Sequence, residues 1–84
     1  MNKTDIMRRV GERCRQSRIN SNLKQSDIAT MLDTTQQNIS TFENGDNNSM
    51  HLLIGYIAVC DNVKPLFDYV LELNKELRIN GKTN

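Results

Sequence analysis

Two short segments with helical patterning, separated by a tight turn, constrain the fold of this chain more than any other feature. The segments cover about residues 24–32 and 36–44. Thr35 comes just before the second segment, where its side-chain oxygen can accept a hydrogen bond from a first-turn N–H group. Helical spacing lets four apolar residues share one small core: Ile28, Leu32, Ile39 and Phe42. We therefore expect two short helices that pack on each other.

The second of these helices must turn an uncharged polar face away from that core. The residues on this face form hydrogen bonds and carry no charge: Gln36, Gln37, Ser40, Thr41 and Asn44. Such a pair of helices is typical of helix-turn-helix proteins, in which the second helix reads base edges of double-stranded DNA. A glutamine amide can bond adenine N6 and N7, and a threonine methyl can pack on the thymine methyl. The alternative is a polar helix that only faces solvent.

The chain also resembles the lambda-repressor/Cro-like, XRE-type helix-turn-helix family. The shared residues are Gly11, Arg13, Arg18, Gln25, Ile28, Ala29, Ile39, Glu43, Asn44 and Gly45. The Thr-Thr-Gln-Gln run at residues 34–37 is similar to the start of the recognition helix in lambdoid phage repressors. The resemblance covers about residues 10–63 and implies an all-α, five-helix DNA-binding domain, here with an extended C-terminal helix.

The resemblance assigns roles to individual residues. Gln25, in the first turn of its helix, would contact a DNA phosphate, although it could instead only cap that helix. Arg18 would pair with Glu43 and hold the first helix to the end of the recognition helix. The resemblance also implies that Gln36, Gln37 and Thr41 face base edges. Together with the polar face predicted from helical spacing, the expected DNA-binding set is Gln25, Thr35, Gln36, Gln37, Ser40, Thr41 and Asn44.

Three positions call for left-handed backbone. Relatives often carry glycine where Asn22 and Asp33 stand, and both residue types tolerate that conformation better than most. Gly45 follows the recognition helix and should supply its left-handed cap. Many members of this family carry lysine or arginine in the following loop to bind phosphate, whereas residues 46–48 of this chain contain neither.

Two further helices complete the core. The first should run from Asp5 to Ile19 or Asn20, with Thr4 as its cap. Its inward stripe should be Ile6, Val10, Cys14 and Ser17. The fourth should span residues 50–60 with Ser49 as its cap. It is the most apolar helix and should form the other wall of the core, through Leu53, Ile54, Ile57, Ala58 and Cys60. Gly55 should mark close packing against a neighbour.

The last helix is long for such a domain and carries a wide apolar stripe. Pro65 suits its first position, and the stripe consists of Leu66, Phe67, Val70, Leu73 and Leu77. We expect this face to pack on a second copy in a homodimer, the alternative being that it folds back over its own core. The organisation is then a DNA-binding core at 1–64, a dimerisation helix at 65–79 and a flexible tail at 80–84.

Composition narrows the functional classes. The net charge is only +1, but most basic residues precede Gln25, and the acidic residues gather later. A single histidine and the absence of a metal-ligand or phosphate-loop motif argue against an enzyme, a metal site or a cofactor. Without a signal peptide or a long apolar run, we expect a cytoplasmic bacterial protein, possibly encoded by a phage. The competing interpretation is a protein-binding module, such as an antitoxin or an inhibitor.

Overall fold

The computed structural model of the chain describes the backbone of residues 2–82 and the side chains of residues 2–78. Five helices follow one another: α1 (Lys3–Asn20), α2 (Gln25–Met31), α3 (Gln36–Glu43), α4 (Met50–Val59) and α5 (Lys64–Lys82). Over the described residues there is no strand. The predicted all-α, five-helix fold is therefore confirmed.

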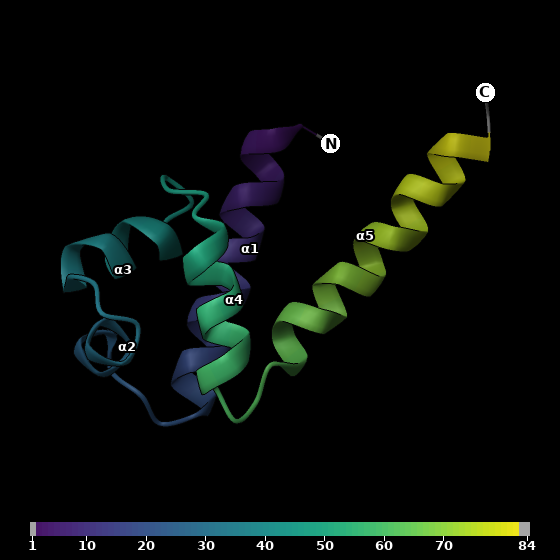
Figure 1. Cartoon of the computed structure of the whole chain (residues 1–84). Helices are drawn as coiled ribbons and strands as arrows, with labels where there is room; N and C mark the ends of the chain where they lie inside the picture. The colour runs from purple at the N-terminus through teal and green to yellow at the C-terminus, as the bar shows by residue number, and fades with distance from the viewer. Residues whose placement is uncertain (1, 83–84) are drawn as a thin grey trace.

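α1 is the central element of the arrangement. It packs against α3, α4 and α5, and α2 packs against α3 and α4. The helices α2 and α3 lie on one side of α1, and α5 diverges from it on the other (Figure 1). The core is built from these buried residues: Cys14, Ile28, Ala29, Ile39, Phe42, Leu52, Tyr56, Cys60 and Leu66. Three of the four apolar residues predicted to join α2 and α3 are thus buried, and Leu32 is half-buried against the same core.

The predicted turns and two of the predicted caps are confirmed. The backbone is left-handed at Asn22 (φ 60°), Asp33 (φ 54°) and Gly45 (φ 85°). The Thr35 hydroxyl accepts a hydrogen bond from the Asn38 N–H group, and Ser49 caps α4 in the same way. These local signals fix where α3 and α4 begin.

The predicted cap of α1 is wrong. The helix starts before Thr4, because the Asn2 side chain accepts the hydrogen bond of the Asp5 N–H group at 2.9 Å. Asparagine ranks at least as high as threonine at this position. With Asn2 as the cap, Asp5 also falls in the first turn, where a negative charge favours the helix dipole.

α4 forms a wall of the core as predicted, but not through all of the residues that were expected to build it. Leu52 and Tyr56 are buried, whereas Ile54 is 56% exposed and Ala58 is exposed as well. Gly55 explains the difference, since a Cβ atom there would lie 2.5 Å from Leu32 Cδ1. The glycine lets Leu32 approach the backbone of α4 and so turns that side of the helix inward. The close packing expected at Gly55 is confirmed.

α5 differs from the prediction in its length and in its inner face. It continues to Lys82, so residues 80–82 of the expected flexible tail are helical, and residues 83 and 84 lie outside the described residues. Leu66 and Tyr69 are buried, with the Arg13 guanidinium 5.7 Å from the centre of the Tyr69 ring. The first turns of α5 therefore pack on the core of their own chain, and Leu66 is removed from the predicted dimerisation face.

The outer side of α5 remains apolar. Four of its large apolar side chains are between 47% and 62% exposed: Phe67, Val70, Leu71 and Leu77. Leu73 is half-buried. None of the helices within residues 2–82 is both long enough and apolar enough to cross a membrane.

Candidate nucleic-acid interface

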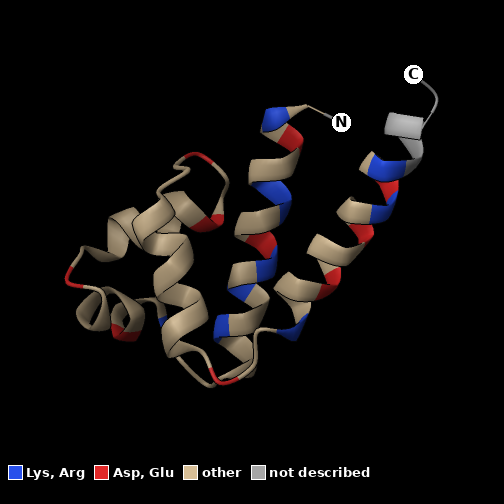
Figure 2. Cartoon of the chain, turned by 45° about the vertical axis from the view of Figure 1, so that its right-hand side comes forward, with Lys and Arg blue, Asp and Glu red and all other residues tan. Residues whose placement is uncertain are grey.

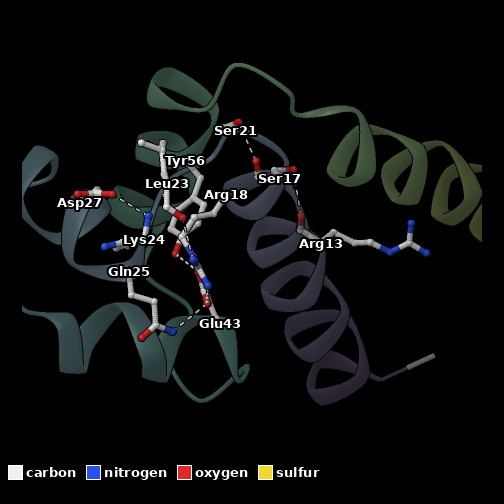
Figure 3. Close-up of polar contacts among 10 residues, drawn as sticks. All are labelled: Arg13, Ser17, Arg18, Ser21, Leu23, Lys24, Gln25, Asp27, Glu43 and Tyr56. Carbon is white, nitrogen blue, oxygen red and sulfur yellow. Dashed lines mark hydrogen bonds and ion pairs between the residues drawn. The ribbon is translucent and has the colours of Figure 1, made fainter.

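The last residue of α3, Glu43, holds that helix in place from the inside. Arg18 Nε donates to Glu43 Oε2 at 2.7 Å, and Arg18 Nη2 donates to Oε1 at 3.2 Å. The Tyr56 hydroxyl donates to Oε2 at 2.6 Å, and Gln25 Nε2 donates to Oε1 at 3.1 Å (Figure 3). Glu43 is only 5% exposed. Side chains from α1, α2 and α4 thus meet on one carboxylate, and the ion pair implied by the resemblance is present.

The electrostatics of this cluster favour the charged carboxylate. Burial by itself raises the pKa of Glu43, but hydrogen bonds from Arg18, Tyr56 and Gln25 outweigh it and hold the pKa below its usual value. The hydrogen bond to Glu43 raises the pKa of the Arg18 guanidinium. Burial and the adjacent carboxylate raise the pKa of the Tyr56 hydroxyl, so it stays protonated and donates. The cluster is therefore fully hydrogen-bonded at neutral pH.

A close backbone contact also positions α3. A Cβ atom on Gly11 of α1 would lie 2.6 Å from the Phe42 carbonyl oxygen and 2.7 Å from that of Glu43. Only glycine lets α1 cross the end of α3 at this distance. The orientation of α3 is therefore set by the backbone of α1 as well as by the Glu43 cluster.

With Ile39, Phe42 and Glu43 facing inward, α3 presents its polar face outward. Gln36, Gln37 and Asn44 are exposed, and Ser40 and Thr41 are half-buried. Gln37 lies opposite the buried side of the helix, at the centre of the outer face. Thr41 Oγ1 donates to the Gln37 carbonyl oxygen at 2.9 Å, so its hydroxyl is committed to the helix backbone.

Four of the predicted DNA-binding residues are brought together in one place. Gln25 of α2 and three residues of α3, Gln36, Gln37 and Ser40, line a common polar hollow of about 380 Å³. Thr41 and Asn44 lie further along the outer face of α3. Thr35 is exposed at the start of α3, where its oxygen serves as the cap.

The alternative role for Gln25, a simple helix cap, is wrong. The cap is made by Asp27, whose Oδ2 accepts a hydrogen bond from the Lys24 N–H group at 2.8 Å. The Gln25 amide instead donates to Glu43. One N–H of its NH₂ group is used in this way, and the group has a second hydrogen for another acceptor.

Two features escaped the sequence analysis. Tyr56 belongs to the most apolar helix, and no periodicity shows that its hydroxyl reaches Glu43 on another helix. Asn38 is exposed on α3, and its Nδ2 donates to Thr34 Oγ1 at 3.0 Å, which ties the turn to the helix. The signal that could have indicated the Tyr56 contact is the tyrosine itself, because a buried tyrosine hydroxyl usually finds a hydrogen-bond partner.

Charge is separated along the molecule. Residues 24–61 carry one basic residue, Lys24, and five acidic residues: Asp27, Asp33, Glu43, Asp46 and Asp61. The charge of this segment is therefore −4. Lysine and arginine are concentrated on α1 (Figure 2). The segment that contains α3 is therefore acidic in sequence, although its Glu43 is buried and paired with Arg18 of α1.

The remaining chemistry-bearing groups belong to the core. Cys14 and Cys60 are free and buried, and burial raises the pKa of the Cys14 thiol to about 12. Within the part of the chain that the structure describes, no group of three His, Cys, Asp or Glu side chains could hold a metal ion.

No protein-family model matches the chain, and no curated protein matches it. The chemistry of the outer face of α3 is therefore the basis for the functional proposal.

Proposed function

We propose that this chain is a sequence-specific DNA-binding transcriptional regulator that reads base edges with the outer face of α3. One observation carries the proposal: α3 is fixed from inside by the Glu43 cluster, while its outer face holds only uncharged hydrogen-bonding side chains. The resemblance to lambda-repressor/Cro-like domains, above all in residues 34–37, supports the same function.

The outer face suits the major groove, which is about 12 Å wide and admits an α-helix. Gln36 and Gln37 each offer an amide that can bond adenine N6 and N7 together. Thr41 acts differently, because its hydroxyl is bonded to the Gln37 carbonyl oxygen and its methyl remains for a thymine methyl. Contacts of this kind are each worth roughly 1–3 kcal/mol of discrimination, so the half-site should be rich in A·T pairs.

Gln25 would bind a phosphate beside the groove. One hydrogen of its amide is held by Glu43, and the second is free for a phosphate oxygen. The same carboxylate thus positions both the recognition helix and the phosphate-binding amide, so that the register of α3 on DNA is fixed.

The regulator would act as a homodimer through the outer side of α5. Phe67, Val70, Leu71 and Leu77 form an exposed apolar surface that a second copy would cover. Two copies would place two α3 helices in successive major grooves about 34–36 Å apart, on an imperfect palindrome. Repression by covering a promoter is the simplest output, and a bacterial cell carrying a phage or another mobile element is the simplest setting.

Selection of bound duplexes from a random DNA library, at near-physiological salt, tests the proposal. We expect a palindrome with A·T-rich half-sites about one helical turn apart. Gln37→Ala should relax the base preference at one position of each half-site, with the thermal unfolding of the protein unchanged. If folded protein recovers no duplex, the proposal fails.

The second candidate is a protein-binding module of the antitoxin or inhibitor type. It is favoured by the charge of −4 on residues 24–61, which repels phosphates, and by the apolar side of α5, which could bind a partner helix. Folded protein that recovers no duplex but forms a stable complex with another protein would support this candidate.

A further inference from the structure

The basic side chains that would bind DNA phosphates lie outside α2 and α3. Residues 24–61 carry a charge of −4, whereas α1 carries six basic and two acidic residues, a charge of +4. Phosphate contacts supply a large part of the affinity of most DNA-binding proteins. Basic side chains of α1 that lie beside α3 are therefore the candidates for phosphate binding.

Two arginines of α1 are committed to other contacts. Arg18 is buried and bonded to Glu43. Arg13 lies between α1 and α5, where Nη1 donates to the Pro65 carbonyl oxygen at 3.4 Å and Nη2 lies 3.8 Å from Glu72 Oε2. Neither side chain is available to a phosphate without the loss of these contacts.

Two other arginines lie on the side of α1 that faces the end of α3. Arg8, Gly11 and Arg15 are spaced by three and four residues, so they share one face of the helix. Gly11 is the residue that meets the carbonyl oxygens of Phe42 and Glu43. Arg8 and Arg15 therefore stand about one turn before and one turn after the point where α1 crosses α3.

Arg8 has a second, independent link to the end of α3. A Cβ atom on Gly45 would lie 2.6 Å from Arg8 Cα, so the backbone of α1 touches the residue that terminates α3. Asn44, the preceding residue, is exposed on the outer face of α3. From Asn44 the molecular surface thus continues through Gly45 to Arg8.

We propose that Arg8 and Arg15 bind the phosphate backbone that flanks the groove occupied by α3. This inference rests on the proposed function and deepens it. Both side chains are exposed, and a guanidinium presents paired N–H groups that match two oxygens of one phosphate. Arg8 also contacts Asp5 at 3.2 Å, but this pair is largely exposed, and exposed pairs of this kind are weak. A phosphate can replace the Asp5 carboxylate there.

The test is the salt dependence of binding to the selected duplex, measured for Arg8→Gln, Arg15→Gln and the double variant. Each phosphate contact contributes about 0.9 to the slope of log affinity against log salt concentration. The double variant should therefore lose about 2 in slope for each bound chain, with the same base preference as the parent. Both side chains are exposed, so the variants should unfold at the parent temperature.

Arg9→Gln is the matched control. It removes the same charge from the same helix, but Arg9 lies about 160° around α1 from Gly11, on the side near Tyr69. Its slope should match that of the parent. An unchanged slope in the double variant, or an equal loss in Arg9→Gln, would overturn the inference while leaving the reading function intact. A parent protein that selects no duplex would overturn the proposed function, and the inference with it.

Discussion

At the scale of single residues, the main constraint is the burial of a charged carboxylate. Such a group is costly away from water unless its oxygens receive hydrogen bonds. Glu43 receives them from Arg18, Tyr56 and Gln25, which belong to three different helices. A buried ion pair need not add net stability, but the loss of one partner is expensive. The cluster therefore fixes the orientation of α3 more than it adds to the free energy of unfolding.

Removal of the carboxylate tests this view. Glu43→Ala should lower the free energy of unfolding by about 3–5 kcal/mol, because Arg18 is left buried without its counter-charge. Tyr56→Phe, which removes one hydrogen bond to a charged group, should cost about 1.5–3 kcal/mol. Urea unfolding of the two variants gives both values. Equal losses would show that the carboxylate does not hold the cluster together.

The same cluster predicts acid sensitivity. The pKa of Glu43 is lower in the folded chain than in the unfolded chain, where a glutamate has a pKa of about 4.3. Its contribution to stability is therefore fully present above about pH 4.3 and is lost as the pH falls through the folded-state pKa. Urea unfolding at a series of pH values, from neutral to strongly acidic, should show this loss. Glu43→Gln should lack this part of the pH dependence, and an identical dependence in that variant would contradict the assignment.

The sequence predicted the Arg18–Glu43 pair through its resemblance, but not the other two donors. Gln25 was assigned to a phosphate or to a cap, because the sequence shows only its place in the first turn of a helix. Its bond to Glu43 depends on how α2 and α3 pack. Tyr56 escaped for a similar reason, since its partner comes from a helix that is distant in the sequence.

At the scale of the helices, glycines decide how closely neighbours approach. Caps and turn residues predicted where α3 and α4 begin, because these signals are local. The buried face of α4 was not predictable, since apolar residues occur all round it: Leu52, Leu53, Ile54, Tyr56 and Ile57. Because apolar residues surround the helix, their spacing does not indicate which side of α4 is buried. The contact between Gly55 and Leu32 determines that side.

Two matched substitutions separate the roles of these glycines. Gly11→Ala should lower the free energy of unfolding by roughly 1–3 kcal/mol, because the new Cβ would meet two backbone carbonyl oxygens that cannot move aside. Gly55→Ala would meet only the end of the Leu32 side chain, which can rotate. The helix propensity of alanine, better by about 1 kcal/mol, offsets part of that clash.

Thermal unfolding of both variants checks this difference. A Gly55→Ala variant that is destabilised as much as Gly11→Ala would contradict the proposed difference between a rigid and a yielding neighbour. Under the proposed function, Gly11→Ala should also change the base preference or the DNA affinity of the folded protein, since it displaces α3 relative to α1.

At the scale of the whole molecule, α5 has one side that is buried against its own chain and an apolar side that is exposed to solvent. The apolar stripe predicted a helix over residues 65–79, but neither its continuation to Lys82 nor the division of the stripe was predicted. Leu66 and Tyr69 are buried, whereas Phe67, Val70, Leu71 and Leu77 are exposed. A stripe this wide does not reveal from sequence alone which part its own chain covers, because that depends on the angle between α1 and α5.

A charge placed on the outer side of α5 tests the proposed homodimer. Leu71 is 62% exposed, so Leu71→Asp should leave the monomer folded and abolish the dimer, with weaker binding to the palindrome. Ile54→Asp, on α4, changes a similarly exposed residue and should leave the dimer intact. Sedimentation of the parent and both variants gives the result. Dissociation caused by Ile54→Asp alone would move the interface to α4.

One side of α3 packs against the rest of the chain and the other is exposed, so the two sides can change independently in evolution. Its inner side touches the rest of the fold through Ile39, Phe42 and Glu43, whereas Gln36 and Gln37 are exposed on the other side. Under the proposed function, a lineage of such chains can acquire a new operator by exchanging the outer side chains with little loss of stability. Diverged copies in one genome could then keep the same scaffold and avoid each other's targets.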